Sequence, residues 1–317
     1  MSPQRCTHTT QGVHPPAATP LALRNLGRGQ TDGVSSTAAG APPTLEPSVA
    51  DRLVVLRHRI EAIGPVVVAF SGGADSAFLA WVANDVLGPE GAHAVTAVSP
   101  SLAPEEAADC EALAAEWGLR WTPMPTDELA DPHYTANDGE RCYHCKVELL
   151  AVTGPIAEAE GATVVLGVNL DDLGDHRPGQ RAATERGAVF PLVEAGFTKP
   201  DVRAASAALG LRTWDKPAAA CLASRVPYGT PVTLGVLSEV AAAESALRAL
   251  GFRQLRVRHY GELARLELPV DELAEVVARR DAVVAAVHGA GYRYVTLDLE
   301  GFRSGNLNLS LGSHGAP

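Results

Sequence analysis

The sequence of 317 residues is long enough to bury one large or two ordinary cores, and it carries 26 basic against 37 acidic residues. Three arginines against Asp32 and Glu46 give residues 1–50 a net charge of +1, which leaves a net charge of −12 on the rest of the chain. An acidic body repels nucleic acid unless it has a local basic patch, and no run of eighteen apolar residues could span a membrane. We therefore expect neither nucleic acid nor a membrane as a partner.

Residues 1–50 hold seven prolines, much Ser, Thr, Gly and Ala, and no periodic apolar pattern, which predicts a disordered extension. The sequence shows no apolar segment of the signal-peptide type, so we expect a cytoplasmic protein. Its five cysteines are odd in number and unevenly spaced, which argues against a disulfide framework and for reactive or metal-binding thiols.

Strands and helices alternate from residue 51 to about residue 210. In chain order, apolar spacing and turn residues predict a helix at 53–63, a strand at 65–70, a helix from 77, a strand at 93–99, a helix at 104–117, a strand at 119–124, a short helix after 146, a strand at 163–168 and a helix at 199–209. This alternation is typical of a doubly wound α/β domain, whose ligands bind at the carboxyl ends of the parallel strands. The loops at Ser71, Ser99 and Asn169 fall at those ends.

The pattern changes after Pro217. It predicts a helix at 234–250, strands at 255–257 and 263–268 around a turn, a helix at 271–287 and a strand at 292–299. This run indicates a second, smaller α+β domain over residues 226–303, after an α/β domain over residues 51–225. Residues 304–317 are expected to form a loose tail.

The stretch Ser71–Ser76 (SGGADS) lies between the predicted strand at 65–70 and the next helix. Its glycines allow backbone N–H groups to approach an anion at a helix N-terminus, and Asp75 or Ser76 is expected to cap that helix. GxxxxGK[ST] and GxGxxG are both absent. SGGxDS resembles the PP-loop of the ATP pyrophosphatases, which cleave ATP between its α and β phosphates. The alternative is an ordinary capped Gly-Gly turn.

Four further stretches follow in order: Arg141–Lys146, Gly167–Gly179, Asp215–Gly229 and Leu299–Gly305. With SGGADS they resemble the LarE family over about residues 51–306. Members of that family are ATP-dependent sulfur transferases that help to build the nickel-pincer nucleotide. The resemblance implies a PP-loop domain, a C-terminal domain for substrate or subunit contacts, and a homo-oligomer. It also implies a pyridinium-3,5-dicarboxylate mononucleotide substrate whose carboxylates are adenylated and converted to thiocarboxylates.

The chemistry of adenylation indicates which residues should hold ATP and Mg²⁺. A carboxylate is a poor electrophile until AMP becomes its leaving group, Mg²⁺ prefers hard oxygen ligands such as Asp75, and charge developing on phosphorus needs fixed cations. The residues expected to serve the nucleotide are Ser71, Gly72, Gly73, Asp75, Ser76, Ser99, Lys146, Gly167, Asp172, Arg177 and Arg225. Helix capping is the alternative for Asp172, and a solvated surface charge is the alternative for each of the three cations.

Cys221 begins the Cys-Leu-Ala-Ser-Arg stretch. In the family resembled, this cysteine is the sulfur donor of the sacrificial members, and Arg225 would stabilise its thiolate. Cys142 and Cys145 are also present, and three cysteines can ligate zinc together with His144, or a [4Fe–4S] cluster with one iron open for a labile sulfide. The resemblance implies the cluster route for members with three cysteines. We therefore expect Cys221 and Asp75 to be catalytic and the three cysteines to bind the cluster.

In the smaller domain the resemblance implies that Arg256 and Arg258 hold the substrate phosphate, with Glu244 nearby. The two arginines share a strand face by the period of two, which suits one shared anion. An exposed face with cross-strand salt bridges is the alternative.

Three other functions remain open. A PP-loop tRNA thiolase would need a basic surface, and the three cysteines would have no task in an amide-forming ligase. A nucleotide-binding regulatory module would not turn ATP over to AMP.

Overall fold

The computed structural model describes residues 45–173, 178–217 and 220–303. Most of the predicted N-terminal extension, the predicted tail at 304–317 and Arg177 lie outside the described residues. Helix α1 (Pro47–Ile63) begins within the last residues of the segment expected to be an extension. Pro47 favours this start because a proline in the first turn has a helical φ and lacks an N–H group that would have no partner there.

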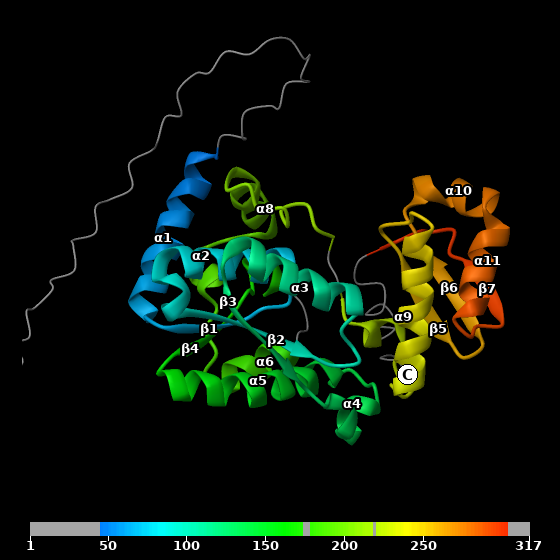
Figure 1. Ribbon diagram of the computed structural model, residues 1–317, viewed down its shortest axis with the longest axis horizontal. Coiled ribbons are helices and arrows are strands. Elements are labelled where there is room, and N and C mark those ends of the chain that lie inside the picture. The colour runs from blue at the N-terminus through cyan, green and yellow to red at the C-terminus, as the bar shows by residue number, and fades with distance from the viewer. Residues whose placement is uncertain (1–44, 174–177, 218–219, 304–317) are drawn as a thin grey trace, which may run out of the picture. The chain divides into compact units, whose positions relative to one another are not determined.

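Four parallel strands form the first sheet, in the order β3-β2-β1-β4 (Figure 1). They are β1 (Val66–Ala69), β2 (Ala92–Val98), β3 (Arg120–Pro125) and β4 (Thr163–Leu166). β1 lies between β2 and β4, and Val66, Val67 and Val68 are almost fully buried. A run of β-branched residues suits a strand covered on both faces, so the predicted doubly wound α/β sheet is confirmed.

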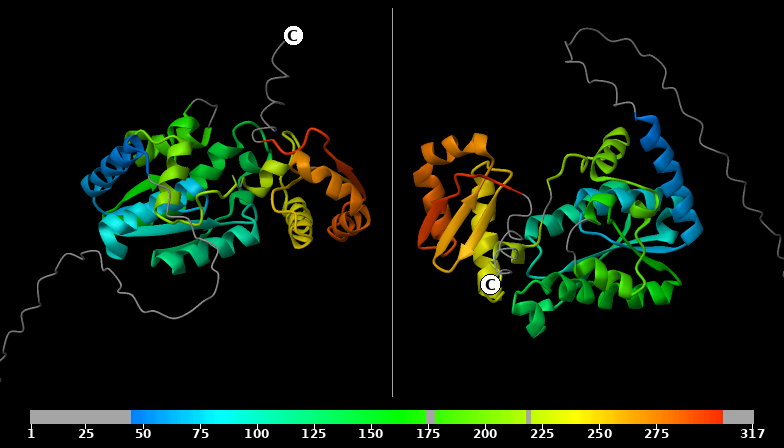
Figure 2. Two further views of the ribbon diagram at one scale, coloured as in Figure 1. Left: turned by 90° about the horizontal axis from the view of Figure 1, so that it is seen from above. Right: turned by 180° about the vertical axis from the view of Figure 1, so that it is seen from behind.

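Helices α1, α2, α3 and α8 lie on one side of this sheet, and α5 and α6 lie on the other (Figures 1 and 2). The elements not yet bounded are α2 (Ala74–Gly91), α3 (Pro104–Trp117), η1 (Glu128–Ala130), α4 (Pro132–Thr135), α5 (Arg141–Glu160), η2 (Leu170–Asp172), α6 (Pro178–Glu185), α7 (Pro191–Glu194) and α8 (Lys199–Ala208). The larger core packs α1, α2, α3 and α8 against the sheet. This arrangement directs the carboxyl ends of the strands toward one set of loops.

Two local predictions need correction. The N-cap of α2 is Gly73, with no side-chain cap bond, so Asp75 and Ser76 lie in the first turn instead of capping it. The helix expected to be short after residue 146 is α5, which runs for 20 residues and begins at Arg141. Cys142 and Cys145 therefore lie on the first turn of a long helix.

The second sheet has the order β5-β6-β7, with β5 and β6 antiparallel and β6 and β7 parallel. Its elements are α9 (Leu234–Ala249), β5 (Arg256–Tyr260), β6 (Leu263–Glu267), η4 (Val270–Glu272), α10 (Leu273–Ala278), α11 (Arg280–Gly289) and β7 (Tyr294–Leu297). The helix predicted at 271–287 is divided at Arg279, whose φ of −103° and ψ of 21° are not helical. Together with α9 and α11 the sheet encloses a core of its own.

A short 3-10 turn, η3 (Leu222–Arg225), connects the two sheets and contacts both α9 and β5. Both sheets belong to one compact unit of the chain. Among the described residues, no helix is long and apolar enough to cross a membrane.

Candidate functional site

A cavity of about 370 Å³ opens at the carboxyl ends of the parallel strands. Its wall includes nine of the residues predicted from sequence: Ser71, Gly73, Asp75, Ser76, Ser99, Cys145, Lys146, Gly167 and Cys221. The remaining predicted residues lie elsewhere, and they are described below. One pocket thus combines the expected nucleotide loop with two of the three expected thiols.

The SGGADS loop is held by hydrogen bonds within itself. The Ser71 amide donates to Ser76 Oγ at 3.2 Å, the two serine hydroxyls are 3.0 Å apart, and Ser76 Oγ donates to the Gly73 carbonyl at 3.2 Å. Because no side chain caps α2, its first N–H groups remain available to a ligand. The loop is therefore a preformed anion site.

Two glycines let other parts of the fold come close to this loop. Gly72 has a φ of +67°, and a Cβ there would lie 2.9 Å from the Sγ of Cys110 on α3. A Cβ on Gly167, after β4, would lie 2.7 Å from the backbone nitrogen of Ser76. Only glycine fits at either place without displacing backbone or core.

Asp75 points a carboxylate into the pocket and has two partners. The Lys199 ammonium group at the start of α8 forms an ion pair with Asp75 Oδ2, and the side-chain Nδ2 of Asn169 donates to Asp75 Oδ1 at 3.2 Å. A half-buried carboxylate at a phosphate site is a suitable Mg²⁺ ligand. Lys199 is a functional candidate that the sequence reasoning did not identify.

The chain has only three lysines among its 26 basic residues, and Lys146, Lys199 and Lys216 all line this pocket. Lys216 Nζ lies 3.1 Å from the Gly72 carbonyl oxygen, 2.6 Å from Asp109 and 2.8 Å from Glu106. Burial alone would lower the pKa of the Lys216 ammonium group, but its hydrogen bonds to both carboxylates raise it, so the group stays charged.

Lys146 differs from the other two lysines because no carboxylate pairs with it within the part of the chain that the structure describes. A cation in a cleft without a counter-ion attracts an anionic ligand. The small number of lysines was a signal available in the sequence, since residues so rare in a chain are informative where they gather.

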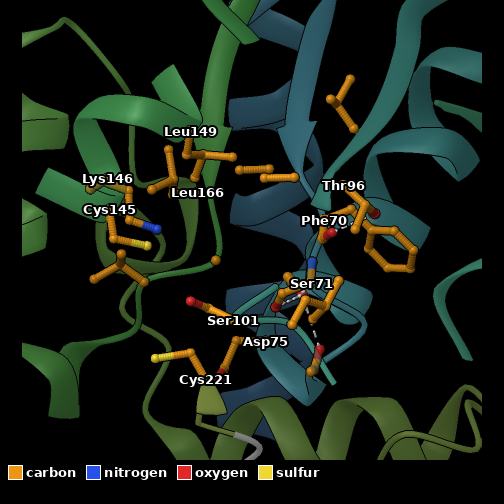
Figure 3. A pocket seen from close by; sticks show the side chains of 18 of the residues that line it. Phe70, Ser71, Asp75, Thr96, Ser101, Cys145, Lys146, Leu149, Leu166 and Cys221 are labelled. Atoms are coloured by element: carbon orange, nitrogen blue, oxygen red, sulfur yellow. Dashed lines mark hydrogen bonds between the residues drawn. The ribbon is translucent and has the colours of Figure 1, made fainter. Parts of the chain in front are cut away.

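Cys145 and Cys221 both line the pocket, on the side away from Phe70 and Thr96 (Figure 3). Burial, followed by the charge of Cys221, raises the pKa of the Cys145 thiol to about 12. Cys142 and Cys145 both lie at the start of α5, and Cys221 shares the pocket wall with Cys145. Cys142 itself is exposed.

No group of three or more His, Cys, Asp or Glu side chains is arranged to hold a metal ion within residues 45–173, 178–217 and 220–303. The donor set itself suits an iron–sulfur cluster, because three thiols converge from two segments. Their side chains would have to turn toward a common centre to bind one.

Ser99 and Glu128 form a polar wall beside these thiols. Ser99 Oγ donates to Glu128 Oε1 at 2.6 Å, and Thr126 Oγ1 donates to Glu128 Oε2 at 3.1 Å. Glu128 is 5% exposed and was not predicted, because a single glutamate after a strand carries no motif.

Asp172 lies outside the pocket wall, in the capping box of η2. Its carboxylate accepts a hydrogen bond from the backbone N–H of Asn169 at 3.2 Å, and Asn169 Oδ1 accepts one from the backbone N–H of Asp171. The structure thus gives Asp172 the capping contacts that were the alternative to nucleotide binding.

Arg225 and Glu244 form a buried ion pair between η3 and α9. Arg225 Nε and Nη2 donate to the two oxygens of Glu244 at 2.8 and 3.1 Å, and Glu244 also accepts from Arg248 and from the Val257 amide. Arg225 Nη1 donates to the Ala220 carbonyl at 2.6 Å and to the Cys221 carbonyl at 3.2 Å. This arginine therefore holds the backbone around Cys221.

Arg256 and Arg258 lie side by side on β5 but have different partners. Arg258 donates to Glu267 at 2.9 Å and to the Ser224 carbonyl at 2.7 Å. Arg256 donates only to the Arg303 carbonyl and lies over the Phe302 ring, with no carboxylate partner among the described residues. Burial, followed by the charges of Arg225 and Arg258, lowers the pKa of Arg256 to about 10.

Comparisons with known proteins identify relatives of this chain. Residues 50–139 match the family model described as NAD synthase. An uncharacterized protein of Synechocystis is 47% identical over 263 residues, which cover 82% of this chain and 98% of that protein. An uncharacterized protein of Methanocaldococcus jannaschii is 25% identical over 75% of this chain and 91% of that protein.

A third relative has a name that states a reaction. The pyridinium-3,5-bisthiocarboxylic acid mononucleotide synthase of Lactiplantibacillus plantarum is 39% identical over 265 residues, 83% of this chain and 96% of that enzyme. Because 265 of 317 residues are covered, the shared length includes the SGGADS loop and both thiol-bearing segments. The chain therefore belongs to the LarE family of PP-loop enzymes, the family of that synthase.

Proposed function

We propose that this protein is an ATP-dependent sulfur transferase that converts the carboxylates of pyridinium-3,5-dicarboxylate mononucleotide to thiocarboxylates. The observation that carries the proposal is the composition of one pocket, in which a preformed anion loop and all three lysines share a wall with two thiols. Phosphate chemistry and sulfur chemistry can then occur on the same bound group.

In the first step a substrate carboxylate oxygen attacks the α-phosphorus of ATP, and pyrophosphate leaves. The uncapped N-terminus of α2 and the three lysines would hold the phosphates, and Asp75 would take a Mg²⁺ ion in place of its contact with Lys199. Lys199 would then be free to contact the leaving pyrophosphate.

In the second step a sulfur nucleophile attacks the acyl carbon, and AMP leaves with the original carboxylate oxygen. Cys221 and Cys145 lie in the wall of the same pocket. The Arg225–Glu244 pair would fix the backbone that presents Cys221, which is a positioning role for two residues first expected to touch nucleotide and substrate phosphate.

The proposal includes a [4Fe–4S] cluster held by Cys142, Cys145 and Cys221. Such a cluster would supply a sulfide for transfer, so that the protein could act more than once. The support is the placement of the thiols: Cys142 and Cys145 lie at the start of α5, and Cys221 lines the same pocket as Cys145. A thiolate ligand set is the one that such clusters require.

Arg256 would bind the phosphate of the mononucleotide. It is a buried guanidinium that lacks a carboxylate partner in the described structure, whereas the neighbouring Arg258 is neutralised by Glu267. A phosphate would supply the missing negative charge. The homo-oligomer expected from the resemblance stays a prediction.

The decisive experiment incubates the purified protein with ATP, Mg²⁺ and the dicarboxylate mononucleotide. We expect substrate-dependent AMP and pyrophosphate, and a thiocarboxylate product detected by mass spectrometry. Formation of ADP and orthophosphate, or thiolation of tRNA in place of the mononucleotide, would contradict the proposal.

The sulfur source is tested by anaerobic reconstitution with iron and sulfide, followed by metal analysis and intact-protein mass spectrometry. We expect bound iron, several turnovers and an unchanged protein mass. A single turnover in which Cys221 loses its sulfur, with no iron bound, would identify the cysteine as a sacrificial donor.

A further inference from the structure

Asn137 ties the segment after Cys221 to the turn that precedes α5. The residue is fully buried, and its side-chain nitrogen lies 3.3 Å from the Val226 carbonyl oxygen, 2.8 Å from that of Pro227 and 2.8 Å from that of Thr230. Its own carbonyl oxygen accepts a hydrogen bond from the Gly229 amide at 3.0 Å. One side chain thus organises a loop about ninety residues away.

The backbone of Asn137 is held in an unfavourable conformation. Its φ of +54° makes it the one non-glycine residue with a positive φ in the described parts of the chain. Such a residue persists only where surrounding contacts require it, and asparagine tolerates this region better than most residues. The geometry therefore indicates that the contacts of Asn137 matter more than its local strain.

Arg141, at the start of α5, extends the same connection. Its Nη1 donates to Asn137 Oδ1 at 2.5 Å and to the Ala223 carbonyl at 2.8 Å. Ala223 is only two residues beyond Cys221, and Arg141 directly precedes Cys142. The arginine therefore bridges the two thiol-bearing segments.

The charge of Arg141 is buried at the N-terminus of α5. The side chain is 3% exposed, it has no carboxylate partner in the described structure, and a cation at a helix N-terminus opposes the helix dipole. An uncompensated buried charge is costly. Its contacts are the hydrogen bonds to Asn137 and Ala223 and the Tyr228 ring, whose centroid lies 5.6 Å from Arg141 Cζ. These contacts hold the cation between the two thiol-bearing segments.

We propose that Asn137 and Arg141 form a clamp that positions Cys221 against the Cys142–Cys145 turn. Neither residue lines the nucleotide pocket, so both act as positioning residues. The inference rests on the proposed function only in the use that it assigns to the assembled thiols.

The test measures thiol proximity without any turnover. In a Cys142→Ser background, a short bifunctional thiol reagent should link Cys145 to Cys221, and mass spectrometry of tryptic peptides should detect the linked pair. We expect this link to be lost in Asn137→Gly and in Arg141→Gln. Because neither ATP nor substrate is added, the result does not depend on the reaction proposed above.

Controls separate the clamp from general destabilisation. Asn137→Gly is used because glycine adopts a φ of +54° without strain, and ATP binding by each variant establishes that the pocket is folded. Arg279→Gln and Asn84→Ala each remove a side chain that donates to a backbone carbonyl elsewhere, and both should retain the link.

Arg141→Lys keeps the charge, but its ammonium group is one bond closer to the backbone than Nη1, the atom that makes both hydrogen bonds, so we expect the link to stay impaired. Full linkage in Arg141→Lys would overturn the hydrogen-bonded clamp. Full linkage in Asn137→Gly or Arg141→Gln with ATP binding intact would overturn the whole proposal.

Discussion

The two ends of the pocket are built in different ways. The nucleotide end is one continuous stretch, residues 71–76, which is closed by hydrogen bonds between its own residues and which neighbouring segments approach at glycine. The thiol end is assembled from three segments, around Ser101, Asn137 to Cys145, and Cys221 to Thr230. A continuous motif can bind phosphate wherever it occurs, whereas a reactive sulfur centre exists only when the whole domain has folded.

The largest effect is expected when the sulfur at the centre of the thiol end is removed. In Cys221→Ala we expect complete loss of thiocarboxylate formation, while substrate-dependent pyrophosphate release continues at a near-native rate because adenylation precedes sulfur attack. Parallel assays of pyrophosphate and of the thiocarboxylate product check this. Native sulfur transfer by the variant would show that Cys221 serves only to fill the core.

Asp75→Ala should disable the nucleotide end. We expect pyrophosphate release to fall by roughly 10²–10³-fold, the effect typical of losing a charge-stabilising group in a preorganised site, with little change in the melting temperature. Asp85→Ala on the same helix is the matched control, because its carboxylate pairs with exposed Arg57 outside the pocket. Equal losses in both variants would mean that helix stability, and not Mg²⁺ binding, is being measured.

Arg256 and Arg258 offer a comparison between a substrate contact and a structural ion pair. Arg258→Gln removes one guanidinium partner of buried Glu267 while Arg265 stays 2.8 Å from its other oxygen, so the free energy of unfolding should fall by about 1–3 kcal/mol. Arg256→Gln removes no ion pair, so stability should hold while the KM for the mononucleotide rises about 10–100-fold. Urea unfolding and steady-state kinetics separate the two. A stability loss in Arg256→Gln together with a raised KM in Arg258→Gln would instead make Arg258 the phosphate contact and Arg256 the structural residue.

A smaller effect concerns Cys110, the thiol that touches the nucleotide end. Burial raises the pKa of this thiol to about 11 from an ordinary value of 9.0, so the folded protein holds the proton more tightly than the unfolded chain. Its contribution is complete below pH 9 and is lost as the pH rises toward 11, by about 2–3 kcal/mol. Urea titrations at pH 8 and pH 10.5 should show a smaller alkaline loss for Cys110→Ala than for the native protein. An equal loss would contradict this assignment.

The same division explains what the sequence could predict. The parallel sheet and the nucleotide loop follow from local patterns, because strand periodicity and glycine geometry are short-range properties. The roles of Asn137, Arg141 and Glu128 do not, since each depends on partners brought close by the fold. Arg225 shows why local spacing was not enough. Its spacing from Cys221 indicated a thiolate contact, whereas its guanidinium group is paired with Glu244 on α9.

The distribution of lysines has a consequence for how this protein meets reactive chemicals. Apart from the amino terminus, every primary amine of the chain lies in the wall of one pocket, while the rest of its positive charge comes from arginine. Reagents that acylate amines would therefore attack the active site or leave the folded enzyme almost untouched. Aldehydes and acyl phosphates would act on this enzyme as active-site inhibitors, and a bound nucleotide would protect its lysines from them.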